Sequence, residues 1–121
     1  MLPTSLKTKI TTPRLDETRD FYMRLFGLKI VEEWNEADDV GCILGFGDIA
    51  AEAFLEIYLG EQAHDFSGLS LQFRTGDLTA FQASLPSGIQ TRGPLERPWG
   101  SKYLYLTDPN GIAIIVYEGG V

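Results

Sequence analysis

The stretch from Trp99 to Glu118 constrains the fold of this chain more than any other part of it. Two runs of alternating character flank the tetrapeptide Asp108–Gly111, which reads DPNG. Proline and asparagine suit the central positions of a type I turn, and glycine tolerates the left-handed backbone that closes such a turn. We therefore predict a β-hairpin in which Asp108 pairs with Ile112.

This register gives the hairpin two chemically different faces, because successive side chains of a strand point to opposite sides. The aliphatic face, which we predict to be the core face, carries Leu104, Leu106, Ile112, Ile114 and Val116. The other face carries Tyr103, Tyr105, Thr107, Ala113, Ile115 and Tyr117. Tyrosine packs well on any half-buried sheet, so this second face is either structural or a binding surface.

Composition limits the class of protein. The chain has 121 residues, of which 44% are hydrophobic, so we expect a single globular domain with a core of its own. A net charge of −7 argues against a nucleic acid or an anionic membrane as partner. The first residues lack the apolar centre of a signal peptide, and the single cysteine cannot form an internal disulfide. We expect a cytoplasmic protein.

The order of elements repeats once along the chain. Strand and helix patterns indicate a strand, a helix and three strands in each half. The first half is predicted as Leu6–Thr12, Leu15–Phe26, Leu28–Trp34, Val40–Phe46 and Ala53–Leu59, with a turn over Asn35–Asp39. The second half is predicted as Leu69–Arg74, a helix capped by Asp77, a weak strand at Ile89–Thr91, a loop over Gly93–Trp99 and the hairpin. Residues 1–121 then form one domain of two modules, about 1–62 and 63–121.

Three segments carry a family resemblance: ETRDFYMRLFGLKIVEEW, the closing segment WGSKYLYLTDPNGIAIIVYE and, more weakly, FSGLSLQFRTGDL. They resemble the vicinal oxygen chelate superfamily, which includes glyoxalases, bleomycin-resistance proteins and dioxygenases. The resemblance implies an α+β fold of two βαβββ modules that form an open, barrel-like cup. It also implies a homodimer, but it does not fix a reaction, since this fold hosts many.

Members of that superfamily that use a metal take its ligands from four strands. The resemblance places these positions at Lys7, Glu56, Ser70 and Ile115, so that only Glu56 is an ordinary metal ligand. A lone carboxylate does not hold a divalent cation against water, and a protonated lysine repels it. We therefore expect neither a metal nor another cofactor.

The cup expected from the resemblance is lined by aromatic and hydrogen-bonding groups. The predicted ligand-binding residues are Tyr58, Gln72, Arg74, Trp99, Tyr103, Tyr105 and Tyr117. Arg74 either binds an anionic group of the ligand or pairs with Glu56. The leading hypothesis is a metal-free protein that binds a small, partly aromatic molecule. The alternatives are an enzyme of the superfamily, such as a lyase or isomerase with Glu56 as general base or a dioxygenase-like enzyme, and a dimeric protein whose cup is vestigial.

Overall fold

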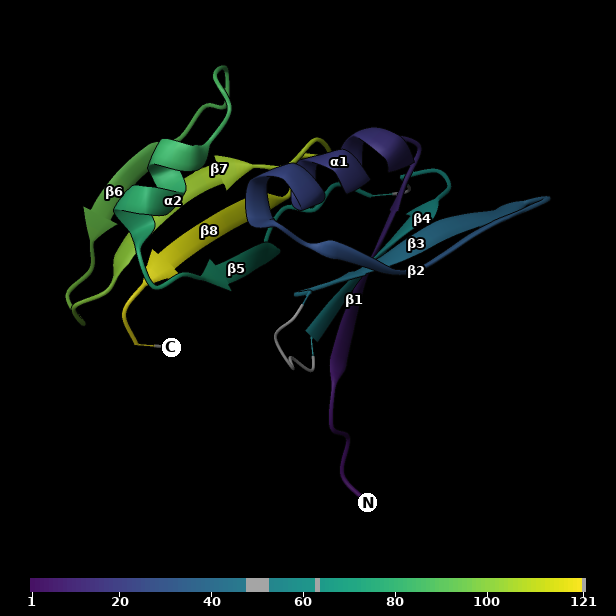
Figure 1. The fold of residues 1–121 in the computed structure, drawn as a ribbon, viewed down its shortest axis with the longest axis horizontal. Coiled ribbons are helices and arrows are strands. Elements are labelled where there is room, and N and C mark those ends of the chain that lie inside the picture. The colour runs from purple at the N-terminus through teal and green to yellow at the C-terminus, as the bar shows by residue number, and fades with distance from the viewer. Residues whose placement is uncertain (48–52, 63, 121) are drawn as a thin grey trace. The chain divides into compact units, whose positions relative to one another are not determined.

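The chain forms two units of the same design, each with one sheet and one helix (Figure 1). A computed structural model describes residues 1–47, 53–62 and 64–120. The units comprise Met1–His64 and Asp65–Val121, and each runs strand, helix and three strands. This arrangement confirms the predicted α+β fold with two βαβββ modules. No helix in the described ranges is long and apolar enough to cross a membrane.

The first unit contains a four-stranded mixed sheet. Its elements are β1 (Leu6–Thr12), α1 (Leu15–Phe26), β2 (Lys29–Glu36), β3 (Asp39–Gly45) and β4 (Ala53–Leu59). The strand order is β1-β4-β3-β2, with β1 parallel to β4 and the other neighbours antiparallel. β2 lies at one edge of the sheet, where it pairs only with β3.

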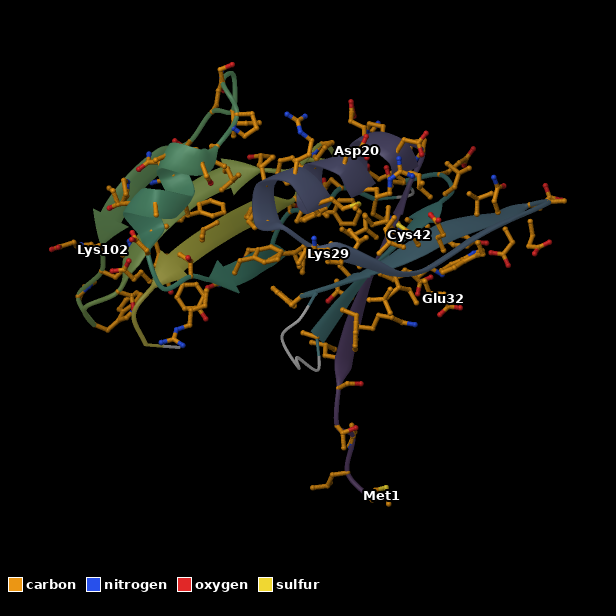
Figure 2. The ribbon with its side chains drawn as sticks, viewed as in Figure 1. Met1, Asp20, Lys29, Glu32, Cys42 and Lys102 are labelled. Atoms are coloured by element: carbon orange, nitrogen blue, oxygen red, sulfur yellow. The ribbon has the colours of Figure 1, made fainter. Side chains whose placement is uncertain are left out.

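Helix α1 covers one face of this sheet because its apolar residues recur at helical spacing. Leu15, Thr18, Tyr22 and Leu25 are buried, and α1 packs on β3 and β4. Figure 2 shows Cys42 on the side of β3 that faces the helix and Glu32 on the other side of the sheet. Gly27 ends α1 in the left-handed conformation, with its N–H donating to the Met23 carbonyl oxygen at 3.1 Å.

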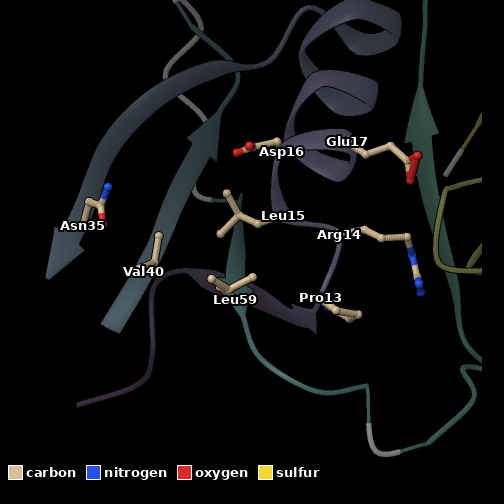
Figure 3. Close-up of a pocket in the computed structure, with 8 residues that line it drawn as sticks. All are labelled: Pro13, Arg14, Leu15, Asp16, Glu17, Asn35, Val40 and Leu59. Atoms are coloured by element: carbon tan, nitrogen blue, oxygen red, sulfur yellow. The ribbon is translucent and has the colours of Figure 1, made fainter. Parts of the chain in front are cut away.

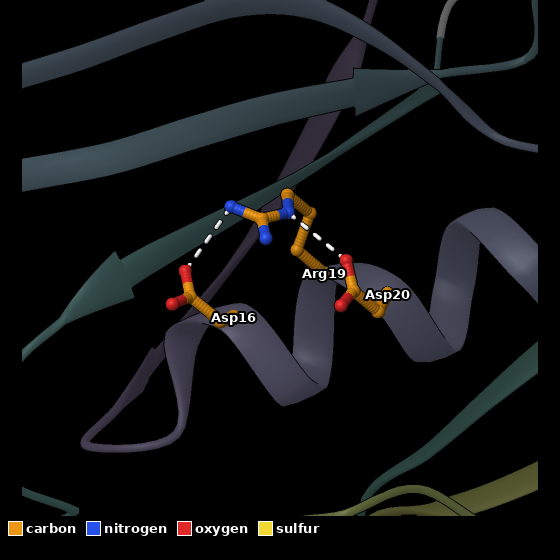
Figure 4. Close-up of polar contacts among 3 residues, drawn as sticks. All are labelled: Asp16, Arg19 and Asp20. Carbon is orange, nitrogen blue, oxygen red and sulfur yellow. Dashed lines mark hydrogen bonds and ion pairs between the residues drawn. The ribbon is translucent and has the colours of Figure 1, made fainter.

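Three charged side chains contact one another along the first turns of α1 (Figure 4). The Arg19 guanidinium donates to the Asp16 carboxylate at 3.1 Å and to the Asp20 carboxylate at 3.2 Å. Both carboxylates are largely exposed, so these pairs contribute little to stability.

The second unit repeats the topology. Its elements are β5 (Ser70–Arg74), α2 (Leu78–Ser84), β6 (Arg92–Glu96), β7 (Lys102–Thr107) and β8 (Ala113–Glu118), in the order β5-β8-β7-β6. The Asp77 side chain caps α2 as predicted, accepting from the Ala80 N–H at 2.9 Å. The Glu118 carboxylate accepts from the Leu78 N–H at 2.8 Å and ties the same helix end to β8.

Two predicted boundaries are wrong. The weak strand predicted at Ile89–Thr91 is absent, and β6 instead occupies Arg92–Glu96, which overlaps the loop predicted over Gly93–Trp99. β6 is an exposed edge strand with a register shift, so it shows no apolar alternation and tolerates Pro94. The turn predicted at Asn35–Asp39 is shorter, because Asp38 adopts a left-handed φ of 64° that lets β2 continue to Glu36.

The closing hairpin has the predicted register. The Asp108 N–H donates to the Ile112 carbonyl oxygen at 3.0 Å, and the Gly111 N–H donates to the Asp108 carbonyl oxygen at 3.1 Å. Tyr105 therefore lies opposite Ile115. Gly111 has a φ of 85°, as the turn requires.

Replacing Gly111 by valine should strain this turn. No other heavy atom lies within 4 Å of a Cβ built at Gly111, so the cost comes from the backbone conformation alone. We expect Gly111→Val to lower the free energy of unfolding by about 1–3 kcal/mol in urea denaturation. Gly76→Ala is the matched control, since Gly76 has equal space and no left-handed φ. Equal stability of the two variants would show that the hairpin register is wrong.

Candidate functional site

The open face of the second sheet carries the tyrosines of the hairpin. Tyr103, Tyr105 and Tyr117 are half-buried on this face, which we call the tyrosine face. On the opposite side of the same strands, the predicted core residues are at most 6% exposed: Leu104, Leu106, Ile112, Ile114 and Val116. As predicted, the aliphatic side chains of β7 and β8 lie on the core face of the sheet and the tyrosines lie on its open face.

The rings of the tyrosine face form one cluster centred on Tyr103. Its ring centroid lies 5.9 Å from that of Tyr117, 6.1 Å from that of Tyr105 and 5.9 Å from that of Trp99. Trp99 meets Tyr103 edge to face from the loop before β7, and the Trp99 residue is 60% exposed. These centroid spacings are typical of favourable aromatic pairs, yet the cluster keeps ring surface open to solvent.

Two arginines lie over rings of this cluster. The Arg92 guanidinium lies 4.0 Å from the ring centroid of Tyr105. The Arg97 guanidinium lies 5.0 Å from the centroid of Trp99 and 5.7 Å from that of Tyr103. Sequence reasoning missed both arginines, because Arg92 begins β6 and Arg97 directly follows it, and no strand was predicted there.

Gln72 and Arg74, which were also predicted to bind the ligand, lie on β5. Gln72 is exposed and pairs in register with Ile115, and Arg74 pairs with Tyr117. The Arg74 Nε donates to the carbonyl oxygen of Gly119 at 2.7 Å. One end of its guanidinium is therefore held by the backbone. A depression of about 380 Å³ is lined by residues of β6, β7 and β8, which include Arg92, Tyr105 and Ala113.

The open face of the first sheet is dominated by charges. Glu56 is buried, and its Oε1 lies 3.4 Å from the Lys7 Nζ and its Oε2 3.9 Å from the Lys9 Nζ. The Lys9 Nζ also lies 4.3 Å from the ring centroid of Tyr58. Sequence reasoning considered Glu56 either as a partner of Arg74 or as a general base. It missed that both carboxylate oxygens of Glu56 lie beside lysines of β1.

A second set of contacts on this face centres on Asp39. Its Oδ1 accepts from the Trp34 Nε1–H at 2.8 Å. The hydrogen bond between the Tyr58 hydroxyl and Asp39 raises the pKa of Tyr58, with smaller contributions from desolvation and from the charge of Asp39. Sequence reasoning missed the contributions of Trp34 and Asp39. A depression of about 590 Å³ on this face is lined by Lys7, Lys9, Glu32, Trp34, Glu36, Asp39, Ile43, Glu56 and Tyr58.

The metal site implied by the resemblance does not fit these residues. In the parallel register of β1 and β4, Lys9 lies opposite Glu56, where its ammonium repels a cation. On β8, Ile115 offers no donor atom, and its neighbour on β5 is Gln72. Among the side chains that the structure describes, no three histidine, cysteine, aspartate or glutamate groups gather as metal ligands do.

A further depression of about 540 Å³ lies at the start of α1 (Figure 3). Pro13, Leu15, Val40 and Leu59 supply its apolar walls. Arg14 on its rim donates to the Gln62 side chain at 2.8 Å. None of the predicted site residues is among the described residues that line it.

The chain belongs to the glyoxalase/bleomycin resistance protein/dioxygenase superfamily, whose sequence model matches residues 5–116. Its fold is similar to that of TnmS3, an antibiotic-binding protein from Streptomyces sp. CB03234, with a TM-score of 0.74, 20% identity and coverage of 99% of this chain and 100% of that one. A lactoylglutathione lyase from Agrobacterium tumefaciens has a TM-score of 0.72 at 19% identity, covering 98% and 96%.

A bleomycin-binding protein complexed with bleomycin is also similar, with a TM-score of 0.67, 23% identity and coverage of 98% of this chain and 100% of that one. No protein of curated function matches the chain in sequence. Binding proteins and an enzyme therefore share this fold, which alone does not decide between them.

The contact between Tyr58 and Asp39 can be tested by titration. Removing the Asp39 charge by Asp39→Asn should lower the pKa of the Tyr58 phenol towards its ordinary value, because a carboxylate acceptor favours the neutral phenol. Ultraviolet titration of phenolate absorbance, with Tyr58→Phe to assign the transition, measures the shift. Asp38→Asn is the matched control, since asparagine tolerates the left-handed backbone there; the Asp38 charge is the smallest of the causes that raise the Tyr58 pKa, so this variant should lower that pKa less than Asp39→Asn does. An unchanged Tyr58 transition in Asp39→Asn would contradict the contact.

Proposed function

We propose that this chain is a small-molecule-binding protein of its superfamily and that the tyrosine face binds the ligand. The observation that supports this most strongly is the aromatic cluster around Tyr103, which is ordered by ring contacts yet remains partly exposed. A purely structural cluster would gain more free energy by burying these rings. The 60% exposure of Trp99 leaves one large indole surface for stacking on a flat ligand.

Two of the structural relatives support the same kind of function. One is described as an antibiotic-binding protein, and another was solved with bleomycin bound. Sequestration of a partly aromatic molecule, without chemistry, is the role that we propose here.

The buried free thiol of Cys42 fits a reducing compartment, and we propose the cytoplasm.

Calorimetric titration with a neutral aromatic probe, 2-naphthamide, tests the proposal. We expect saturable binding that Tyr105→Leu and Tyr117→Leu each weaken roughly 5- to 10-fold, because each removes a ring contact worth about 1 kcal/mol. Tyr58, which was also predicted from the sequence to bind the ligand, lies on the other sheet in contact with Lys9 and Asp39, and we now propose that Tyr58→Leu leaves the affinity unchanged. Titration with bleomycin extends the test to a ligand of one relative. No binding of either probe, or equal losses in all three variants, would contradict the proposal.

We also propose that the protein works without a divalent metal. The Lys7 and Lys9 ammonium groups beside Glu56 and the apolar Ile115 support this proposal. We expect elemental analysis of the purified protein to show zinc, nickel, manganese and iron far below one ion per chain. Chelator should leave the unfolding midpoint unchanged. Near-stoichiometric metal that Glu56→Ala removes would instead favour a metal-dependent lyase, isomerase or dioxygenase.

A homodimer with twofold symmetry is the proposed assembly. β2 and β6 are exposed edge strands of the two sheets, and unpaired edges favour association. Light scattering at micromolar concentration should give twice the mass of the 13.5 kDa chain. A monomer under these conditions would contradict the proposed assembly and leave the tyrosine face unaffected.

A further inference from the structure

The tyrosine face concentrates positive charge in an acidic protein. The chain has a net charge of −7, with 17 acidic residues against 10 lysines and arginines. Several cations outside the tyrosine face have oxygen partners: Lys7 and Lys9 lie beside Glu56, and Arg19 pairs with two aspartates. Across the described residues, no carboxylate pairs with Arg92 or Arg97.

Each of these two guanidinium groups is held by aromatic rings. Arg92 lies over Tyr105, and Arg97 lies over Trp99 and Tyr103. A guanidinium that stacks on a ring through its flat face keeps its N–H groups in the plane, directed past the ring edge. Such a planar set of donors matches the two oxygens of a carboxylate.

Arg97 also has an unsatisfied donor. Its Nε is buried and donates to no acceptor among the residues that the structure describes. Buried polar atoms are almost always hydrogen-bonded, so an orphan of this kind requires an explanation. An anionic ligand at the tyrosine face would supply oxygen acceptors to this guanidinium.

We propose that the ligand of the tyrosine face is a flat aromatic carboxylate, whose ring stacks on the aromatic cluster and whose carboxylate binds Arg92, Arg97 or both. This inference rests on the proposed function and names its ligand class. The net charge of the chain repels anions at long range, so the selectivity comes from these two local groups. Arg74, the arginine expected from the sequence to bind an anion, already donates its Nε to a backbone carbonyl.

Calorimetry with a matched pair of probes, 2-naphthoate and 2-naphthamide, tests this assignment. The two share a ring system and differ in charge. We expect 2-naphthoate to bind roughly tenfold more tightly than 2-naphthamide, since hydrogen bonds to charged groups are the stronger ones. Arg92→Gln and Arg97→Gln should between them remove this preference, because they should weaken the binding of 2-naphthoate by a larger factor than the binding of 2-naphthamide.

Lys102→Gln is the matched control. Lys102 immediately precedes Tyr103 on β7, so its side chain points to the opposite side of the strand, and the change removes one positive charge from the same unit. It should leave the preference for the acid intact. If Arg97→Gln does not fold, Arg97→Lys can replace it. Lysine keeps the charge but loses the planar set of N–H donors, so this variant should still weaken the binding of 2-naphthoate selectively.

The outcomes separate this inference from the proposed function. Equal affinities of the native protein for the two probes would overturn the carboxylate assignment but keep an aromatic-binding face. Arginine variants that weaken both probes equally would also overturn it, because the arginines would then only support the rings. If neither probe binds, the proposed function fails together with this inference.

Discussion

The carboxylate of Asp108 fixes the part of the structure on which the candidate site depends. It accepts from the Asn110 N–H at 2.8 Å and from the Ile112 N–H at 2.9 Å, and the residue is only 5% exposed. These bonds close the turn between β7 and β8, the two central strands of their sheet. A shift of one residue in the register of β7 and β8 would place the tyrosines on the core face and the aliphatic side chains on the open face. The aromatic cluster therefore follows from the geometry of one turn.

The two sheets share a topology but present different chemistry. On the first sheet, the charges near Glu56 are compensated within the protein, because two lysines meet its oxygens and Asp39 accepts from Trp34. On the second sheet, rings and guanidinium groups contact one another, and the Arg97 Nε has no acceptor among the residues that the structure describes. The first face is thus largely satisfied by its own residues, whereas the second offers both stacking surface and charge to a ligand.

Local signals were enough to predict much of this protein from its sequence. Local sequence patterns predict the ends of α1, the cap at Asp77 and the closing hairpin, because each depends on residues only a few positions apart. The pairing of Lys9 with Glu56 and of Arg92 with Tyr105 depends on strand register, which local pattern does not fix for parallel or irregular edge strands. The tyrosines of the candidate site were therefore predicted from the sequence, whereas its charged partners were found only in the structure.

The position of the ligand can be measured directly by nuclear magnetic resonance of the ¹⁵N-labelled protein. Addition of 2-naphthoate should shift the side-chain Nε–H signals of Arg92 and Arg97, together with backbone amide signals of β7 and β8. A saturable response confined to these residues would place an aromatic anion on the tyrosine face. Shifts confined instead to β1 and β4 around Glu56, with both arginine signals unmoved, would contradict the central claim that the tyrosine face is the binding surface.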